Sequence, residues 1–247
     1  SSSRCASTNT ARPAEAMGTI SIAMCGRFAQ TSSAEELVQL FGLKSRPHVV
    51  PSFNIAPTQP IIVIREHPPG RYADVCRWGL VPSWSKDIRT GHRLFNARAE
   101  TVFTKRSFAG PAKKQRCVVP ATGFYEWRDT LGGKMPTLFQ PTKTEVFFFA
   151  GLWSTWMDKL GAVLYTATIL TTEANPRMAP FHHRMPVLLE PDEMSLWLDM
   201  TISDPTKLAP LLKTAPDSAL SLRPVSQRVN NVRHNDPQCW DNPIFAK

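Results

Sequence analysis

Twenty-two prolines, spread from Pro13 to Pro243, constrain the fold of this 247-residue chain more than any other feature. Proline has no backbone N–H to donate to a helix or a sheet, so it ends or bends regular elements. The chain is therefore expected to form short helices and strands. This favours one closed or strongly bent mixed sheet over a regular strand–helix–strand repeat.

The pattern of apolar residues predicts strands in the middle of the chain and helices around them. Ser33 and Glu36 have the spacing of a capping box, so a helix of about ten residues is predicted to end at Gly42. Strands rich in β-branched and aromatic residues are predicted at 61–65, 72–78, 145–150, 163–170 and 186–189. Two more helices are predicted at 191–200 and 204–212. The predicted fold class is α+β: a single domain with a bent, mixed or antiparallel β-sheet approaching a barrel, with flanking helices.

Positive charge is concentrated in one stretch of the chain. The net charge is +9, and residues 77–116 contain ten Lys or Arg against two acidic residues. The same stretch contains five large aromatic residues: Trp78, Trp84, Phe95, Phe103 and Phe108. Single-stranded nucleic acid requires a basic groove for its phosphates and aromatic surfaces for its bases. The stretch therefore predicts a nucleic-acid-binding groove, and the alternative is a solvated basic face.

Cysteine usage and hydropathy indicate the class of protein. Five widely spaced cysteines without a C-x-x-C pair predict a reducing intracellular compartment and no disulfides. That compartment would be the nucleus in a eukaryote, or the cytoplasm and nucleoid in a bacterium. Zinc ligands come in close pairs, and the neighbours His182 and His183 point in different directions, so no metal site is predicted. The longest apolar run, 146–153, falls short of the ~20 residues that span a bilayer. We expect a soluble monomer with no metal and no organic cofactor.

Five short motifs contain residues that can carry chemistry. They are MCGRF at 24–28, FNIAPT at 53–58, NARAET at 96–101, GFYEW at 123–127 and HHRMP at 182–186. Taken singly, a cysteine in an apolar context or a glutamate beside aromatic residues is more often structural than catalytic. Their occurrence together is what indicates a functional site.

These motifs together resemble those of the SRAP family, the SOS-response-associated peptidases, which are understood as abasic-site processing proteins. Three further stretches match: RWGLVPSW at 77–84, CVVP at 117–120 and VN at 229–230. The resemblance covers residues 24–240, and residues 241–247 are expected to be a C-terminal tail. Residues 1–23, rich in Ser, Thr and Ala, are expected to be a disordered leader or a gene-model extension.

The resemblance implies a catalytic cysteine that is exposed as the N-terminal residue, assisted by an Asn, a Glu and a His. In this sequence the implied catalytic residues are Cys25, Asn96, Glu126 and His182. The implied DNA-binding residues are Arg27, Asn54, Trp78, Arg98 and Arg184. In the family's H-x-R-M-P pattern the first histidine is the functional one, which selects His182 over His183.

These residue types suit covalent capture of an abasic site in single-stranded DNA during the DNA damage response. The open form of an abasic sugar is an aldehyde, and the amine of an N-terminal Cys25, with a reference pKa near ~8, can form an imine with it. The thiol of the same residue can then close a five-membered thiazolidine, because it is held two bonds away. Glu126 is expected to move protons, His182 to protonate the sugar oxygen, and Asn96 to orient the sugar by hydrogen bonds.

An internal cysteine cannot perform this chemistry, because its nitrogen is part of an amide. Cys25 follows 24 residues here, so the prediction applies to a chain that begins at Cys25. Translation from Met24, removal of the leader by self-cleavage or otherwise, and loss of the activity remain open, with an upstream-start artefact as the leading explanation. Two other functions also remain open. One is a thiol peptidase with Cys25 as nucleophile and His182 as base, and the other is a non-catalytic module that binds single-stranded DNA.

Overall fold

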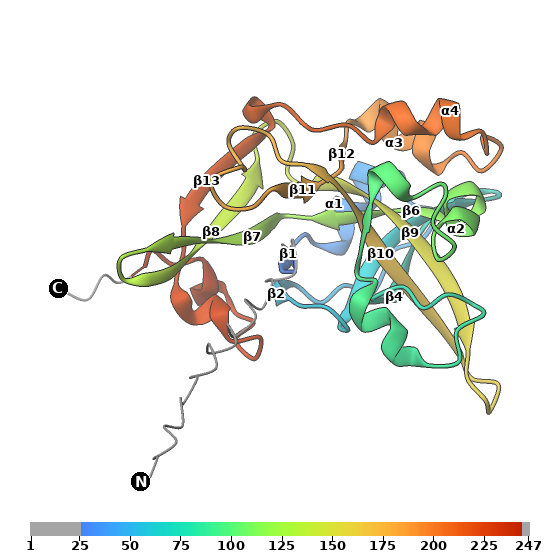
Figure 1. Cartoon of the computed structure of the whole chain (residues 1–247), viewed down its shortest axis with the longest axis horizontal. Coiled ribbons are helices and arrows are strands. Elements are labelled where there is room, and N and C mark those ends of the chain that lie inside the picture. Colours follow the sequence, from blue (N-terminus) through green and yellow to red (C-terminus); the bar gives the residue numbers. More distant parts are fainter. Residues whose placement is uncertain (1–25, 244–247) are drawn as a thin grey trace, which may run out of the picture.

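A closed barrel of five strands forms the centre of the computed structural model, which describes residues 26–243 (Figure 1). Its strands are β3 (Pro60–His67), β4 (Gly70–Trp78), β6 (Arg116–Ala121), β9 (Phe147–Met157) and β10 (Val163–Glu173). Around the barrel the order is β10–β4–β3–β6–β9 and back to β10. β4 and β10 pair in parallel, and the other four pairs are antiparallel. The prediction of a single α+β domain with a bent mixed sheet approaching a barrel is confirmed.

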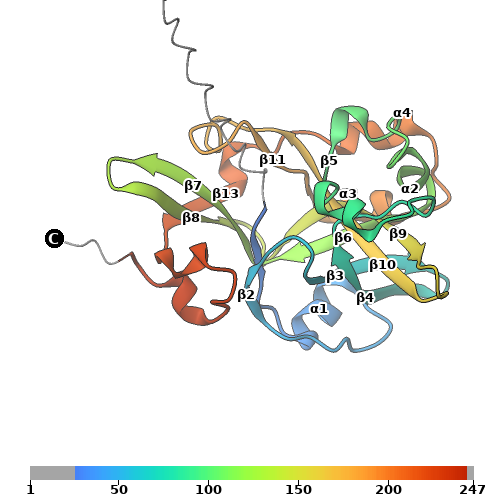
Figure 2. The same cartoon turned by 60° about the horizontal axis from the view of Figure 1, so that its bottom comes forward.

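A second sheet projects from the barrel as an arm (Figures 1 and 2). Its strands, in order, are β13 (Leu220–Pro224), β8 (Gly133–Pro141), β7 (Gly123–Thr130), β1 (Phe28–Gln30) and β2 (Ser52–Ile55). The chain passes from β6 of the barrel to β7 of the arm with one residue between them. The β7–β8 hairpin was not predicted from the sequence, because its outer half is polar and β8 contains Pro136 and Pro141.

Short helices cover the outside of the barrel. α1 (Ala34–Phe41) has the predicted capping box of Ser33 and Glu36 and ends at Gly42, whose φ of 61° is the left-handed conformation that glycine adopts readily. The other helices are α2 (Ala109–Lys114), α3 (Pro191–Leu198) and α4 (Pro205–Leu208). The helix predicted through Leu212 ends early and continues as a 3-10 turn at Ala209–Leu211, because Pro210 cannot donate the next helical hydrogen bond. No helix within residues 26–243 is long and apolar enough to cross a membrane.

Apolar side chains of the barrel strands divide between two clusters. Val63, Trp78 and Phe149 belong to the cluster inside the barrel, together with Phe28 from the arm. Ile64, the neighbour of Val63, points the other way, into the cluster between the barrel and the helices. The predicted strands at 61–65, 72–78 and 163–170 lie in β3, β4 and β10, whereas the one at 145–150 begins at Phe147 and runs on to Met157. The strand predicted at 186–189 is divided between β11 (Arg184–Pro186) and β12 (Leu188–Leu189).

Candidate active site

The larger of two neighbouring cavities, which we call the histidine cavity, contains three of the predicted site residues. Asn96, Arg98 and His182 line it, and its volume is about 850 Å³. Asn96 and Arg98 lie on β5 (Asn96–Arg98), which pairs in parallel with β10. His182 precedes β11, which pairs with the same end of β10. Residues 86 positions apart in the sequence therefore reach one cavity because both segments are anchored to β10.

The smaller cavity, which we call the glutamate cavity, has a volume of about 480 Å³. Glu126 of β7 lines it and is only 5% exposed, and Arg27, just before β1, lines it as well. Phe95 lines both cavities, so the two adjoin at this residue. The structure thus brings four predicted residues, Asn96, Glu126, His182 and Arg27, around Phe95.

His182 is held in a defined tautomer. The backbone N–H of Arg184 donates to Nδ1 of His182 at 3.0 Å, so Nδ1 is an acceptor and the ring proton of the neutral form lies on Nε2. Burial and the neighbouring His183, whose ring stacks at 4.3 Å, lower the pKa of His182 below its ordinary value. At neutral pH the ring is therefore an uncharged N–H donor.

Within residues 26–243, Arg27 is held through one of its three side-chain nitrogens. Its Nη1 donates to Oδ1 of Asn54 at 2.8 Å and to the carbonyl oxygen of Val229 at 2.6 Å. The guanidinium lies 5.5 Å from the centre of the Trp127 ring. Burial lowers the pKa of Arg27, but a guanidinium stays protonated at neutral pH. The group is a fixed positive charge at the glutamate cavity.

Three residues predicted to bind DNA lie inside the protein. Trp78 is fully buried, and its Nε1 donates to the carbonyl oxygen of Phe95 at 2.8 Å. Asn54 is 1% exposed, and its Nδ2 donates to three carbonyl oxygens of residues 229–234. Arg184 is buried and forms a two-pronged ion pair with Glu100. Trp78 Nε1, Asn54 Nδ2 and both Nη atoms of Arg184 bind protein atoms here, and DNA binding by these three residues stays a prediction.

Four exposed residues that were not among the predicted site residues carry positive charge or an aromatic ring, and two of them, Lys105 and Lys134, line the cavities. Trp84 is 51% exposed, and the guanidinium of Arg106 lies 4.4 Å from its ring centre. Lys105 lines the histidine cavity and Lys134 the glutamate cavity. The basic and aromatic stretch at 77–116 contained the signal for the first three, but the sequence alone did not separate exposed Trp84 from buried Trp78. Nothing in the sequence indicated Lys134, which comes from the unpredicted hairpin.

The cysteines within residues 26–243 are poor nucleophiles. Cys76, Cys117 and Cys239 are buried and form no disulfide. Burial raises the pKa of Cys76 to about 12 and the pKa of Cys117 well above the ordinary value, so both thiols stay protonated at neutral pH. The predicted nucleophile Cys25 lies outside the described residues. The residue that follows it, Gly26, lines the glutamate cavity.

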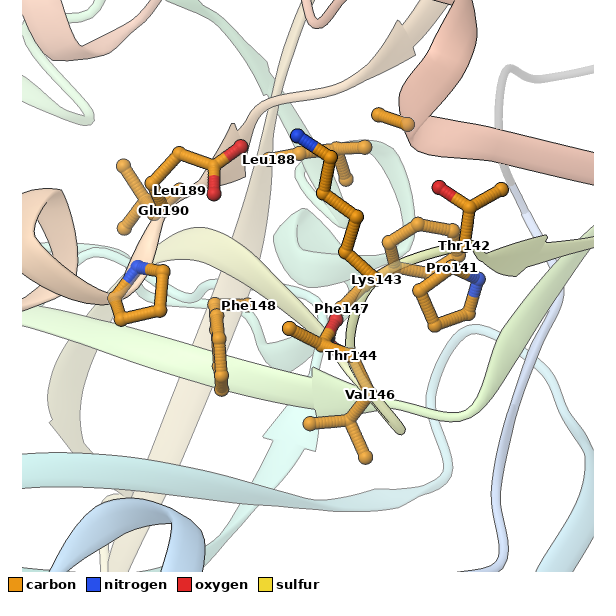
Figure 3. Close-up of a pocket in the computed structure, with 12 residues that line it drawn as sticks. Pro141, Thr142, Lys143, Thr144, Val146, Phe147, Phe148, Leu188, Leu189 and Glu190 are labelled. Carbon is orange, nitrogen blue, oxygen red and sulfur yellow. Dashed lines mark hydrogen bonds between the residues drawn. The ribbon is translucent and has the colours of Figure 1, made fainter.

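Another cavity, of about 520 Å³, is lined by residues of the segment 32–51, among them Arg46 and His48, and contains none of the predicted site residues. No group of three or more His, Cys, Asp and Glu residues in the described part of the chain is arranged to hold a metal ion. A pocket between the β8–β9 connection and the start of α3 has a volume of about 40 Å³, room for no more than a few water molecules. Figure 3 shows it as mainly apolar, with Phe148 and Leu189 among its lining residues together with the charged Lys143 and Glu190.

The chain is similar in sequence and in structure to known proteins. The family model for SOS response associated peptidase (SRAP) matches residues 24–232. The chain is 36% identical over 219 residues to the abasic site processing protein YoqW of Bacillus subtilis, covering 87% of this chain and 98% of that protein. It is 34% identical over 260 residues to the abasic site processing protein HMCES of Gallus gallus, covering 87% and 77%. A crystal structure of a protein from Bacteroides thetaiotaomicron superimposes with a TM-score of 0.80 at 25% identity, covering 89% of this chain and all of that one. The chain therefore belongs to the SOS response associated peptidase (SRAP) family.

Proposed function

We propose that this protein processes abasic sites in single-stranded DNA by forming a covalent crosslink through Cys25 as the N-terminal residue. The observation that carries the proposal is the meeting of the two cavities at Phe95, which gathers Asn96, His182 and Glu126 beside Gly26, the residue after Cys25. The names of the relatives YoqW and HMCES support an abasic site as the substrate. Within the cell, the adduct would shield the site during the DNA damage response.

The proposed reaction has two steps. The neutral amine of Cys25 attacks the aldehyde of the open sugar, and the resulting carbinolamine loses water to give an imine. The thiol sulfur then adds to the imine carbon while its proton passes to the imine nitrogen, which closes the thiazolidine ring. Glu126 takes and returns the protons, and the Nε2–H of His182 donates to the sugar oxygen that leaves the ring carbon during ring opening. Asn96 orients the sugar by hydrogen bonds without adding charge.

The surroundings of the cavities favour a single strand as the form of DNA. Arg98, which is exposed, and Lys105 line the histidine cavity, so the phosphates of a strand at this cavity meet positive charge. Phe95, which lines both cavities, offers an aromatic face, which only unpaired bases can use. A strand bound in this way leaves its sugars accessible from the cavities.

The test compares two versions of the protein, one starting at Met24 and one at Ser1, on a single-stranded oligonucleotide with one abasic site. We expect a covalent adduct on a denaturing gel only from protein whose N-terminus is shown by mass spectrometry to be Cys25. An oligonucleotide whose abasic aldehyde has been reduced to an alcohol, and the variant Cys25→Ala, should both give none. An adduct of equal yield with Cys25→Ala would overturn the proposal, as would none from protein with Cys25 exposed.

A thiol peptidase is the second candidate function, because the family description names one. In a Cys–His peptidase the histidine must accept the thiol proton, which requires an unprotonated ring nitrogen facing the cysteine. The hydrogen bond from Arg184 occupies Nδ1 and leaves the proton on Nε2, which favours His182 as a donor rather than a base. We expect Cys25-dependent cleavage of an unrelated peptide to be absent under conditions that give complete crosslinking. Turnover of such a peptide by the Ser1 version would favour the peptidase instead.

A further inference from the structure

An ion pair crosses the end of β10 and joins the two segments that line the histidine cavity. Arg184, on β11, donates from Nη1 and Nη2 to the two carboxylate oxygens of Glu100 at 2.5 and 2.8 Å, and from Nη2 to the carbonyl oxygen of Thr171 at 2.6 Å. Glu100 lies in the 3-10 turn Ala99–Thr101, directly after β5. β5 and β11 both pair with the last residues of β10, at Thr171 in each case. The pair therefore ties the wall that holds Asn96 to the wall that holds His182.

The contacts of Arg184 argue against a role as a phosphate ligand. Its side chain is 8% exposed, both Nη atoms are bound to protein oxygens, and the carboxylate beside it would repel a phosphate. The same residue also controls His182, because its backbone N–H is the donor to Nδ1. A displacement of Arg184 would thus change both the distance across the cavity and the tautomer of the histidine.

We propose that Glu100 and Arg184 are positioning residues for the reaction: their ion pair holds β5 and β11 in register across β10 and keeps His182 as the Nε2–H tautomer. The inference rests on the proposed function for its effect on rate. It adds two residues that touch neither the sugar nor the nucleophile but set the geometry of those that do. A small displacement of a catalytic group can cost a large factor in rate.

Kinetics and DNA affinity separate positioning from phosphate binding. Glu100→Gln keeps the shape of the side chain but removes the charge, and Arg184→Lys keeps the charge but removes the planar fork. We expect each variant to crosslink about tenfold or more slowly, with affinity for intact single-stranded DNA within about twofold of the wild type, because neither side chain contacts the strand. If Arg184 binds a phosphate instead, Arg184→Lys should keep the affinity for DNA because it keeps the charge. Arg184→Gln should weaken this affinity and lower its salt dependence. That result would overturn the proposal.

Nitrogen NMR of His182 tests the positioning without any reaction. In the wild type we expect the chemical shifts of an unprotonated Nδ1 and a protonated Nε2, and in Glu100→Gln a mixture of the two tautomers. The control is Asp74→Asn, which breaks the ion pair of Asp74 with Arg65, whose guanidinium stacks on Tyr165 near the start of β10. That variant should lose some stability but keep the His182 shifts and the crosslinking rate.

The outcomes distinguish this inference from the proposed function. If wild-type protein with Cys25 exposed forms no adduct, the proposed function fails, and the NMR comparison still decides whether the ion pair controls His182. If Glu100→Gln keeps both its rate within twofold and the wild-type His182 shifts, the positioning role is wrong even though the crosslink forms. The positioning role is supported if Glu100→Gln crosslinks more slowly and shows altered His182 shifts, while Asp74→Asn shows neither change.

Discussion

Arg116 and Arg27 are two arginines withdrawn from solvent, and they differ in what their nitrogens bind. Arg116 is completely buried and uses Nε, Nη1 and Nη2 to donate to four backbone carbonyl oxygens. These oxygens belong to residues at the C-terminal ends of α2 and α3: Ala112, Lys113, Trp197 and Asp199. Arg27 uses only Nη1 within residues 26–243, and its Nε is buried with no hydrogen-bond partner there.

The difference separates an arginine with a structural role from one that we propose binds DNA. Helix C-termini carry partial negative charge, so α2 and α3 stabilise the guanidinium of Arg116, and the charge of Asp199 adds to this. Burial lowers the pKa of Arg116 to about 10, which leaves it charged at neutral pH. All three of its nitrogens are used, and no cavity adjoins it among those described above. Arg27 keeps donors beside a cavity of about 480 Å³, which is the arrangement expected for a group that binds an anion.

Replacing Arg116 should give the largest effect on stability. Arg116→Met fills a similar volume but leaves four buried carbonyl oxygens without donors, so we expect the free energy of unfolding to fall by about 3 to 5 kcal/mol. Urea denaturation followed by tryptophan fluorescence measures this directly. Arg128→Met on the exposed part of the β7–β8 hairpin is the matched control and should change stability by less than about 0.5 kcal/mol. A loss below about 1 kcal/mol for Arg116→Met would contradict a structural role.

Replacing Asn54 should affect both stability and the site, because this residue connects Arg27 to the C-terminal segment. Asn54→Ala removes three buried donor contacts and the acceptor for Arg27, so we expect a loss of about 2 to 3 kcal/mol in the free energy of unfolding. We also expect slower crosslinking, since Arg27 loses one of its two anchors. The variant Arg27→Ala should lose less stability than Asn54→Ala and more affinity for DNA. Equal effects of the two variants on both properties would remove the distinction between anchor and ligand-binding arginine.

The sequence was most informative where local chemistry decides the structure. The Ser33–Glu36 capping box and Gly42 defined α1 because a cap and a left-handed glycine act within a few residues. The strands β3, β4 and β10 were predicted because their β-branched and aromatic residues also lie within a few positions of one another. The β7–β8 hairpin was missed because its strands are stabilised by pairing with β1 and β13, which are distant in sequence.

The site could be predicted as a set of residues but not as an arrangement. Trp78 and Trp84 lie six positions apart in one motif, and only the barrel register places the first inside and the second outside. The sequence suggested that Arg184 is a phosphate ligand. Its ion-pair partner Glu100 lies 84 positions away, and no local pattern indicates this pair. Asn54 was assigned to DNA by its motif, whereas its partners come from the segment around Val229. In each case the deciding contact is non-local.

The smallest effect is expected from Lys134, an exposed cation at the rim of the glutamate cavity. If it contacts one phosphate, Lys134→Ala should reduce the slope of log affinity against log salt concentration by about 0.7 for a single strand. Its stability and its crosslinking rate at saturating DNA should stay unchanged, because the side chain makes no hydrogen bond or ion pair within residues 26–243. Lys207→Ala, on α4, changes the net charge equally and should leave the slope unaltered. An equal change in slope from both variants would mean that the overall charge of the protein, rather than a phosphate contact at the glutamate cavity, sets the affinity.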